Sequence, residues 1–240
     1  MNLNELSGSV PCHCSAPHRT ALVALTGGPG AGKTAVLEVL KRHLCKHLVV
    51  LPEAASILFG GGFPRETSGA GRRAGQRAIF GVQRQLERLA IEHGGFAVAL
   101  CDRGTVDGLA YWPESEAAFW QDVGSSRAAE HARYAAVIHL RSPGADQGYE
   151  VTSNPVRTET ALEAARIDAC IHLAWEGHAR RTTIESADTF LEKLTRAIDA
   201  IRAEMPACCR GHLPSGGAEG DPACEHRGSP ETPGHGPEGG

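Results

Sequence analysis

Residues 20–34 read Thr-Ala-Leu-Val-Ala-Leu-Thr-Gly-Gly-Pro-Gly-Ala-Gly-Lys-Thr, and this stretch decides the fold. The apolar run 22–25 predicts a buried strand, which leads directly into the pattern Gly27-x-x-x-x-Gly32-Lys33-Thr34. Apolar residues at helical spacing follow directly after this pattern. A strand, a Gly-rich turn and a helix in this order are typical of the phosphate-binding P-loop, whereas an accidental Gly-rich turn lacks these flanking elements.

The loop has the chemistry to hold a nucleoside triphosphate and its metal ion. Glycines free the backbone N–H groups to point inward as a nest for phosphate oxygens, and the helix N-terminus adds partial positive charge. The Lys33 ammonium can reach the β- and γ-phosphates, and the Thr34 hydroxyl is a Mg²⁺ ligand of the usual kind. We expect ATP and Mg²⁺ to bind at Gly27, Gly28, Pro29, Gly30, Ala31, Gly32, Lys33 and Thr34.

The composition excludes several other classes of protein. A length of 240 residues fits one domain with tails, and a formal net charge of −4 gives no reason to expect a nucleic-acid partner. No apolar run is long enough to span a bilayer, and the first residues lack the charged and apolar regions of a secretory signal. We therefore expect a cytoplasmic protein with reduced thiols, in which Cys45, Cys101 and Cys170 are small core residues.

Strand and helix patterns alternate along the central part of the chain. Residues 1–19 are expected to be a flexible leader, residues 20–204 the ATP-binding domain, and residues 205–240 a disordered Pro- and Gly-rich tail. Five strands alternating with helices predict an α/β fold with a doubly wound parallel sheet. The predicted strands lie at 22–25, 47–51, 96–101, 135–140 and 182–185, and the main helices at 33–44, 76–93, 159–177 and 188–204.

A second part of the site is predicted where the third strand ends in Asp102-Arg103. Ligands of open α/β sheets collect at the carboxyl ends of the strands, so Asp102 can hold Mg²⁺ beside the P-loop. The simpler alternative is an aspartate that only caps the helix near Thr105. Arg103 can stabilise a transferred phosphoryl group but cannot activate water, which favours transfer to an acceptor over hydrolysis.

Glu53 is the third candidate, because it ends the second strand at the same edge of the sheet. Its carboxylate could orient an acceptor hydroxyl or accept its proton, which makes Glu53 a candidate catalytic residue together with Lys33, Asp102 and Arg103. The alternative is a charge that only stabilises the N-terminus of the next helix.

Arginines surround two further regions. Arg141, Arg157 and Arg166 bracket an aperiodic segment at 142–155, which could close as a lid over the phosphates; we assign Arg157 to the nucleotide. A solvated surface is the alternative for each. A second group could dock an acceptor or simply form a solvated helix face: Arg65, Arg72, Arg73, Arg77, Gln83 and Arg84.

Cysteine and histidine gather near both ends of the chain. Cys12-His13-Cys14 lies in the leader, and Cys208, Cys209, Cys224 and His226 lie in the tail. Their spacing matches no pair of Cys-x-x-Cys zinc knuckles, so the sequence alone does not predict a zinc site.

Several longer segments together carry a family resemblance. They are Gly-Gly-Pro-Gly-Ala-Gly-Lys-Thr at 27–34, Leu-Pro-Glu-Ala-Ala at 51–55, the helix at 76–87, Cys-Asp-Arg-Gly-Thr-Val-Asp-Gly-Leu-Ala-Tyr-Trp-Pro at 101–113, Asn-Pro-Val-Arg-Thr-Glu at 154–159 and Trp-Glu-Gly-His at 175–178. The chain resembles, over residues 20–204, the bacterial AAA-type ATP-binding proteins grouped with the NadR kinase domain and with a eukaryotic TRP-like-channel translocation protein. The resemblance implies a P-loop fold of the nucleoside/nucleotide-kinase type, with ATP or GTP at residues 27–34.

Two functions remain open at this stage, because the group contains a nicotinamide-riboside kinase, a GTP-binding trafficking protein and members of unassigned activity. The first is a Mg²⁺-dependent phosphotransferase acting on a small, nucleoside-like metabolite that carries a hydroxyl group. The second is a nucleotide-dependent switch or slow NTPase that binds a protein or lipid partner. A Ras-like GTPase is disfavoured, since the chain has neither Asn-Lys-x-Asp nor Asp-x-x-Gly after its third strand.

Overall fold

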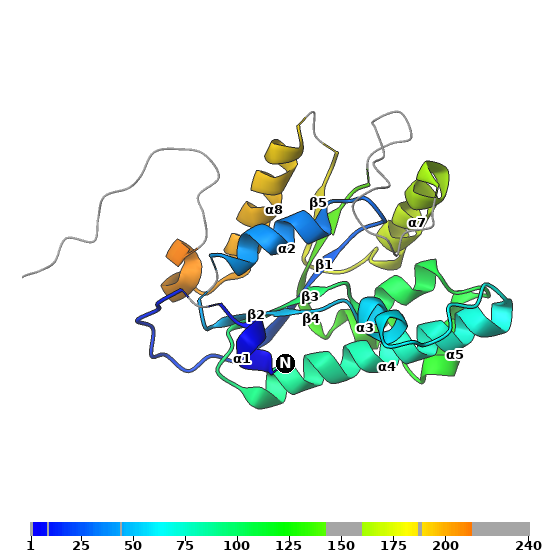
Figure 1. Cartoon of the computed structure of the whole chain (residues 1–240), viewed down its shortest axis with the longest axis horizontal. Helices are drawn as coiled ribbons and strands as arrows, with labels where there is room; N and C mark the ends of the chain where they lie inside the picture. Colours follow the sequence, from blue (N-terminus) through cyan, green and yellow to red (C-terminus); the bar gives the residue numbers. More distant parts are fainter. Residues whose placement is uncertain (1, 9, 44, 143–159, 187–188, 213–240) are drawn as a thin grey trace, which may run out of the picture.

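The computed structural model describes residues 2–8, 10–43, 45–142, 160–186 and 189–212, and it confirms the α/β fold (Figure 1). A five-stranded parallel sheet has the order β2-β3-β1-β4-β5. Its strands are β1 (Ala21–Thr26), β2 (Leu48–Leu51), β3 (Val98–Asp102), β4 (Tyr134–Leu140) and β5 (Arg181–Ile184).

The strand order determines what lies beside the P-loop. β1 pairs with β3 in parallel, and Leu25 lies opposite Asp102 in the register. Parallel neighbours end at the same edge of a sheet, so the turn after β1 emerges next to Asp102.

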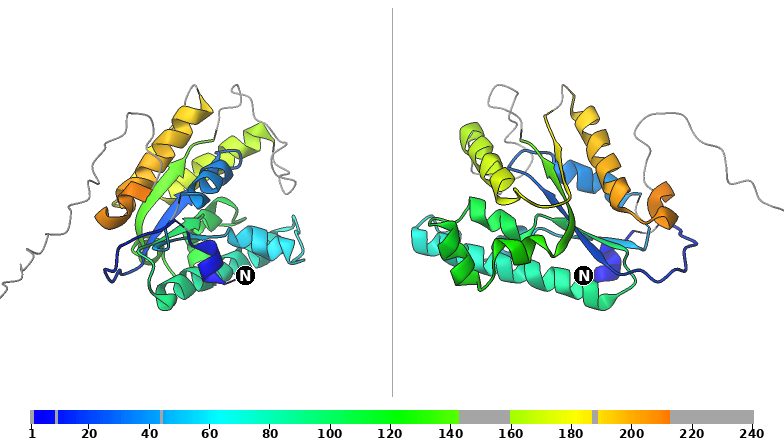
Figure 2. Two further views of the ribbon diagram at one scale, coloured as in Figure 1. Left: turned by 60° about the vertical axis from the view of Figure 1, so that its left-hand side comes forward. Right: turned by 180° about the vertical axis from the view of Figure 1, so that it is seen from behind.

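Helices cover both faces of the sheet (Figures 1 and 2). One face packs against α2 and α8, and the other against α4, η1 and α7, because alternate side chains of each strand point to opposite faces. The helices are α1 (Leu3–Leu6), α2 (Lys33–Lys41), α3 (Ala54–Gly60), α4 (Gly69–His93), α5 (Glu116–Val123), α6 (Arg127–His131), α7 (Ala161–Ala174) and α8 (Phe190–Glu204), with the 3-10 segments η1 (Thr105–Ala110) and η3 (Ala207–His212).

N-terminal caps determine where α4 and α7 begin, and only the start of α4 differs from the sequence prediction. α4 begins at Gly69 rather than near residue 76, since the Ser68 hydroxyl accepts a hydrogen bond from the Gly71 N–H. α7 begins as predicted, with a capping box between Thr160 and Glu163.

The expected leader and tail both contribute to the folded core, which corrects the sequence analysis. Leu3 in α1 is buried against the α4 face of the sheet, and Ser7 forms an isolated bridge with Val49. Met205 and Cys209 are buried against the other face. Packing across distant segments stabilises these ends, although their local sequence has no periodicity. The rest of the predicted tail, 213–240, lies outside the described residues.

None of the helices within the described ranges combines the length and the apolar character that a membrane crossing requires.

Candidate functional site

The P-loop runs from the end of β1 to the start of α2, and its backbone requires glycine. Gly27, Gly30 and Gly32 have φ angles of 138°, 77° and 93°, a region that side chains with a Cβ rarely adopt. At Gly27 there is no space either, because a Cβ atom would lie 2.1 Å from the Leu140 carbonyl oxygen of β4. The loop therefore packs directly against the neighbouring strand.

We predict that Gly27→Ala lowers the free energy of unfolding by about 3 kcal/mol or more, since it combines backbone strain with a clash against a strand carbonyl. Chemical denaturation would measure this. Gly60→Ala is the matched control, because its Cβ would meet no atom within 4 Å; we expect a change below about 1 kcal/mol. Equal effects of the two variants would contradict the tight packing of the loop.

Two backbone N–H groups of the loop donate to the protein itself. The Gly28 N–H donates to Asp168 Oδ1 of α7 at 2.8 Å, and the Ala31 N–H donates to the Gly28 carbonyl at 3.3 Å. These two hydrogen bonds hold the loop in shape.

Lys33 lies folded over the loop that precedes it. Its Nζ donates to the carbonyl oxygens of Gly27 at 2.9 Å and Gly28 at 3.3 Å, and the side chain is buried. Burial, together with the positive charge of Arg103, lowers the pKa of Lys33 to about 8. Lys33 and Thr34 line the same cavity.

Asp102 presents a buried carboxylate oxygen beside the P-loop. Its Oδ1 atom is buried and has no hydrogen-bond partner among the described residues. Burial raises the pKa of Asp102 to about 6, against the opposing charge of Lys33. Carboxylate and hydroxyl oxygens are ligands that Mg²⁺ prefers, so Asp102 and Thr34 fit this ion.

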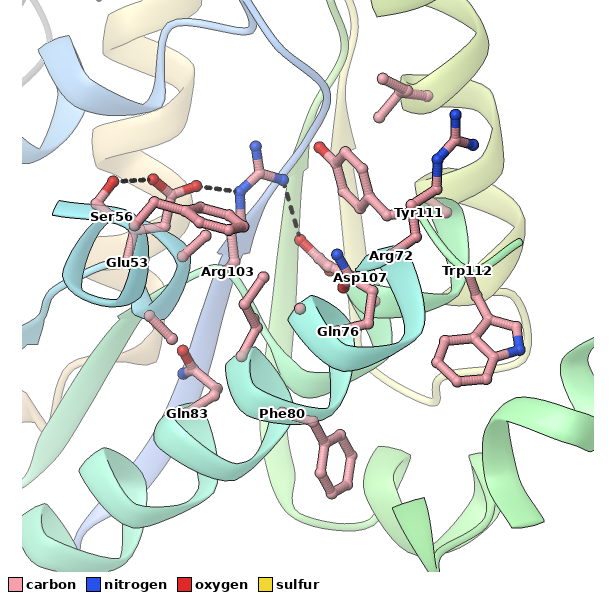
Figure 3. A pocket seen from close by; sticks show the side chains of 18 of the residues that line it. Glu53, Ser56, Arg72, Gln76, Phe80, Gln83, Arg103, Asp107, Tyr111 and Trp112 are labelled. Atoms are coloured by element: carbon pink, nitrogen blue, oxygen red, sulfur yellow. Dashed lines mark hydrogen bonds and ion pairs between the residues drawn. The ribbon is translucent and has the colours of Figure 1, made fainter. Parts of the chain in front are cut away.

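Glu53 and Arg103 form an ion pair at the edge of the loop (Figure 3). Arg103 Nε donates to Glu53 Oε1 at 2.6 Å, and its Nη1 reaches the Gly27 carbonyl at 3.2 Å. Burial alone would raise the pKa of Glu53, but the charge of Arg103 and the hydrogen bond from Ser56 lower it to about 2. Glu53 is thus held ionised, which suits a hydrogen-bond acceptor better than a strong base.

Two buried aspartates that the sequence analysis missed support this arrangement. Asp107 accepts hydrogen bonds from Thr26 Oγ1 at 2.5 Å and Trp175 Nε1 at 2.6 Å, which joins β1, η1 and the end of α7. Asp168 contacts His139 Nε2 at 3.0 Å besides the Gly28 N–H. The sequence held one sign of Asp168: it is a carboxylate among the apolar residues of a predicted helix, and a buried carboxylate needs a partner.

A cavity of about 460 Å³ opens beside the loop, between α3, α4, η1 and α7 (Figure 3). Part of its lining is charged and comes from Lys33, Glu53, Asp102 and Arg103. Another part is aromatic or aliphatic and comes from Phe59, Ile79, Phe80, Tyr111 and Trp112. The shape and lining are typical of a site for a small molecule.

The arginines predicted around the site divide into two groups. Arg65, Arg72 and Arg166 line the cavity, as does Gln83, although the Gln83 amide donates to Glu87. The others contact carboxylates: Arg73 with Glu114, Arg77 with Asp122, Arg84 with Glu130 and Arg141 with Asp168. Arg157 and the predicted lid segment from residue 143 onward lie outside the described residues.

A parallel sheet with a P-loop after its first strand, a lysine over that loop and a buried carboxylate beside it defines a P-loop NTPase-type protein. The chain belongs to the AAA domain family, whose model matches residues 22–193. A P-loop domain of this family indicates nucleotide binding. No curated protein matches the chain.

Proposed function

We propose that this protein is a Mg²⁺-dependent phosphotransferase that moves the γ-phosphoryl group of ATP to a hydroxyl of a small metabolite. The observation that carries the proposal is the cavity, because its lining includes Lys33 and Thr34 of the P-loop together with aromatic side chains of α3 and α4. A hydrolase needs only water at this place, whereas a transferase needs space for an acceptor next to the γ-phosphate.

The residues at the charged end have complementary roles in this proposal. In the reaction the acceptor oxygen forms a bond to the γ-phosphorus, the bond from phosphorus to the β–γ bridging oxygen breaks and leaves ADP, and the hydroxyl proton passes to solvent water. Lys33 and Arg103 offset the negative charge of the transferred group. The ionised Glu53 accepts a hydrogen bond from the hydroxyl and orients its oxygen toward phosphorus. Mg²⁺, held by Asp102 and Thr34, would supply further charge neutralisation of the phosphates.

A nucleoside-like acceptor suits the mixed lining of the cavity. Tyr111, which lies beside Arg103, offers an aromatic surface to a planar ring, and Gln76 and Arg72 offer hydrogen-bonding groups (Figure 3).

Glu53→Gln tests the positioning of the acceptor. The expected result is a loss of phosphoryl transfer of about 10²-fold or more with ATP affinity nearly unchanged, because the carboxylate is proposed to contact the acceptor and not the nucleotide. Glu114→Gln, which removes a carboxylate from an exposed ion pair with Arg73, is the control and should transfer normally. A loss of ATP affinity without a loss of transfer would mean that Glu53 only holds Arg103 in place.

The reaction itself is tested by incubating the purified protein with ATP, Mg²⁺ and a pool of nucleosides and small polar metabolites, followed by mass spectrometry. A compound that gains one phosphoryl group, and only with active protein present, supports the proposal. Tight ATP binding with slow hydrolysis that no acceptor accelerates would contradict it and favour the switch or slow NTPase.

A further inference from the structure

A second group of reactive side chains lies at the amino-terminal end of β2, away from the P-loop at the carboxyl end of β1. Three segments that are distant in sequence meet there. Cys12 comes from the leader, Cys45 and His47 immediately precede β2, and Cys209 lies in η3 near the C-terminal end. One ligand atom from each of the four residues lies within 4.8 Å of the other three. None of these residues contributes to the P-loop or to the acceptor cavity.

The distances in this cluster match those around a tetrahedral zinc ion. Zn–S bonds of about 2.3 Å and Zn–N bonds of about 2.0 Å place two sulfurs about 3.8 Å apart and sulfur and nitrogen about 3.5 Å apart. The observed distance from His47 Nδ1 is 3.4 Å to Cys12 Sγ, 3.4 Å to Cys209 Sγ and 4.0 Å to Cys45 Sγ. Cys12 Sγ lies 4.0 Å from Cys209 Sγ.

Hydrogen bonding alone does not account for this convergence. A single ring nitrogen can donate or accept one hydrogen bond, yet three thiols surround Nδ1 of His47. Cys45, His47 and Cys209 are only 1%, 6% and 0% exposed, so water does not complete the coordination of these groups from outside. A cation at the centre would satisfy all four ligand atoms at once.

We propose that Cys12, Cys45, His47 and Cys209 bind one Zn²⁺ as a closed structural site. Three thiolates and one imidazole in tetrahedral arrangement are a ligand set that selects Zn²⁺, and four protein ligands leave no position for a substrate. The ion would tie the leader and the C-terminal segment to the first residues of β2.

A neighbouring cluster is the competing place for the ion. Cys14, His18 and Cys208 also approach one another, with His18 Nε2 at 3.3 Å from Cys14 Sγ and 3.6 Å from Cys208 Sγ. This set has three ligands with two thiols, and Cys208 is exposed. The two clusters therefore differ in the number of thiolates that a bound metal would receive.

The first test measures metal content of the full chain, purified under reducing conditions from zinc-supplemented cells. We expect about one zinc per chain. Cys209→Ser should lose the zinc, and Cys170→Ser in α7 should retain it. Loss of zinc in Cys14→Ser with retention in Cys209→Ser would overturn the proposal.

The second test uses the unaltered chain and does not depend on a variant that folds. Titration of the metal-free protein with Co²⁺ should give the visible absorption of tetrahedral cobalt and a near-ultraviolet thiolate band that corresponds to three thiolates. A band from two thiolates would place the metal at the neighbouring cluster and refute the proposal. A protein that takes up neither Co²⁺ nor Zn²⁺ would refute it as well.

Discussion

Lys33→Ala is expected to reduce ATP turnover by about 10²–10³-fold or to weaken ATP binding by a similar factor, because it removes the only ammonium of the P-loop. The effect should be large since Lys33 is buried and directed across the loop, where water screens its charge poorly. Isothermal titration with ATP and a turnover assay separate the two contributions.

Lys41→Ala is the matched control for this variant. Lys41 lies at the other end of α2, is exposed and pairs with Glu38 on the surface. Its removal should leave both ATP binding and turnover unchanged. If Lys33→Ala behaved like Lys41→Ala, residues 27–34 would not be the nucleotide site.

A pH dependence follows from the environment of Lys33. Its pKa of about 8 means that the ammonium is mostly charged at pH 7 and loses its proton as the pH rises through 8. ATP affinity should therefore fall above pH 8, and the Lys33→Ala variant should lack this decrease.

Asp102→Asn is expected to abolish most Mg²⁺-dependent activity, by about 10²-fold or more, while the fold is retained. Within the described ranges the buried Oδ1 atom of Asp102 has no hydrogen-bond partner, and a neutral amide cannot replace this carboxylate as a ligand for a hard cation. Measurement of turnover against Mg²⁺ concentration should show a raised Mg²⁺ requirement. Asp122→Asn, a surface carboxylate near Arg77, should leave the Mg²⁺ dependence unaltered.

Asp102→Asn, which is expected to lower activity, is expected to raise the free energy of unfolding of the ligand-free protein at neutral pH. The folded-state pKa of Asp102 is raised to about 6 from 3.8, so its contribution is favourable at low pH and is lost as the pH rises through 6. Between pH 5 and pH 7.5 the wild type should lose about 1 kcal/mol of unfolding free energy relative to Asp102→Asn. A difference that does not change with pH would show that Asp102 titrates normally, and Mg²⁺ should stabilise only the wild type.

Local patterns determined the strands, the main helices and the P-loop of this protein. Hydrophobic periodicity and the spacing from Gly27 to Thr34 are properties of neighbouring residues, so no knowledge of distant segments was needed. The position of Asp102 could also be predicted from the sequence, because a carboxylate that ends a buried strand lies at the carboxyl end of a parallel sheet, where ligands bind.

Only the tertiary structure brought together residues that are distant in sequence. Arg103 meets Glu53 across 50 residues, Asp168 meets Gly28 across 140, and Cys12 meets Cys209 across 197. No local pattern encodes such contacts, because each depends on strand order and on how the segments pack. For the same physical reason, Cys45 and His47 look like ordinary core residues in sequence, and only packing against the leader and η3 makes them a candidate metal site.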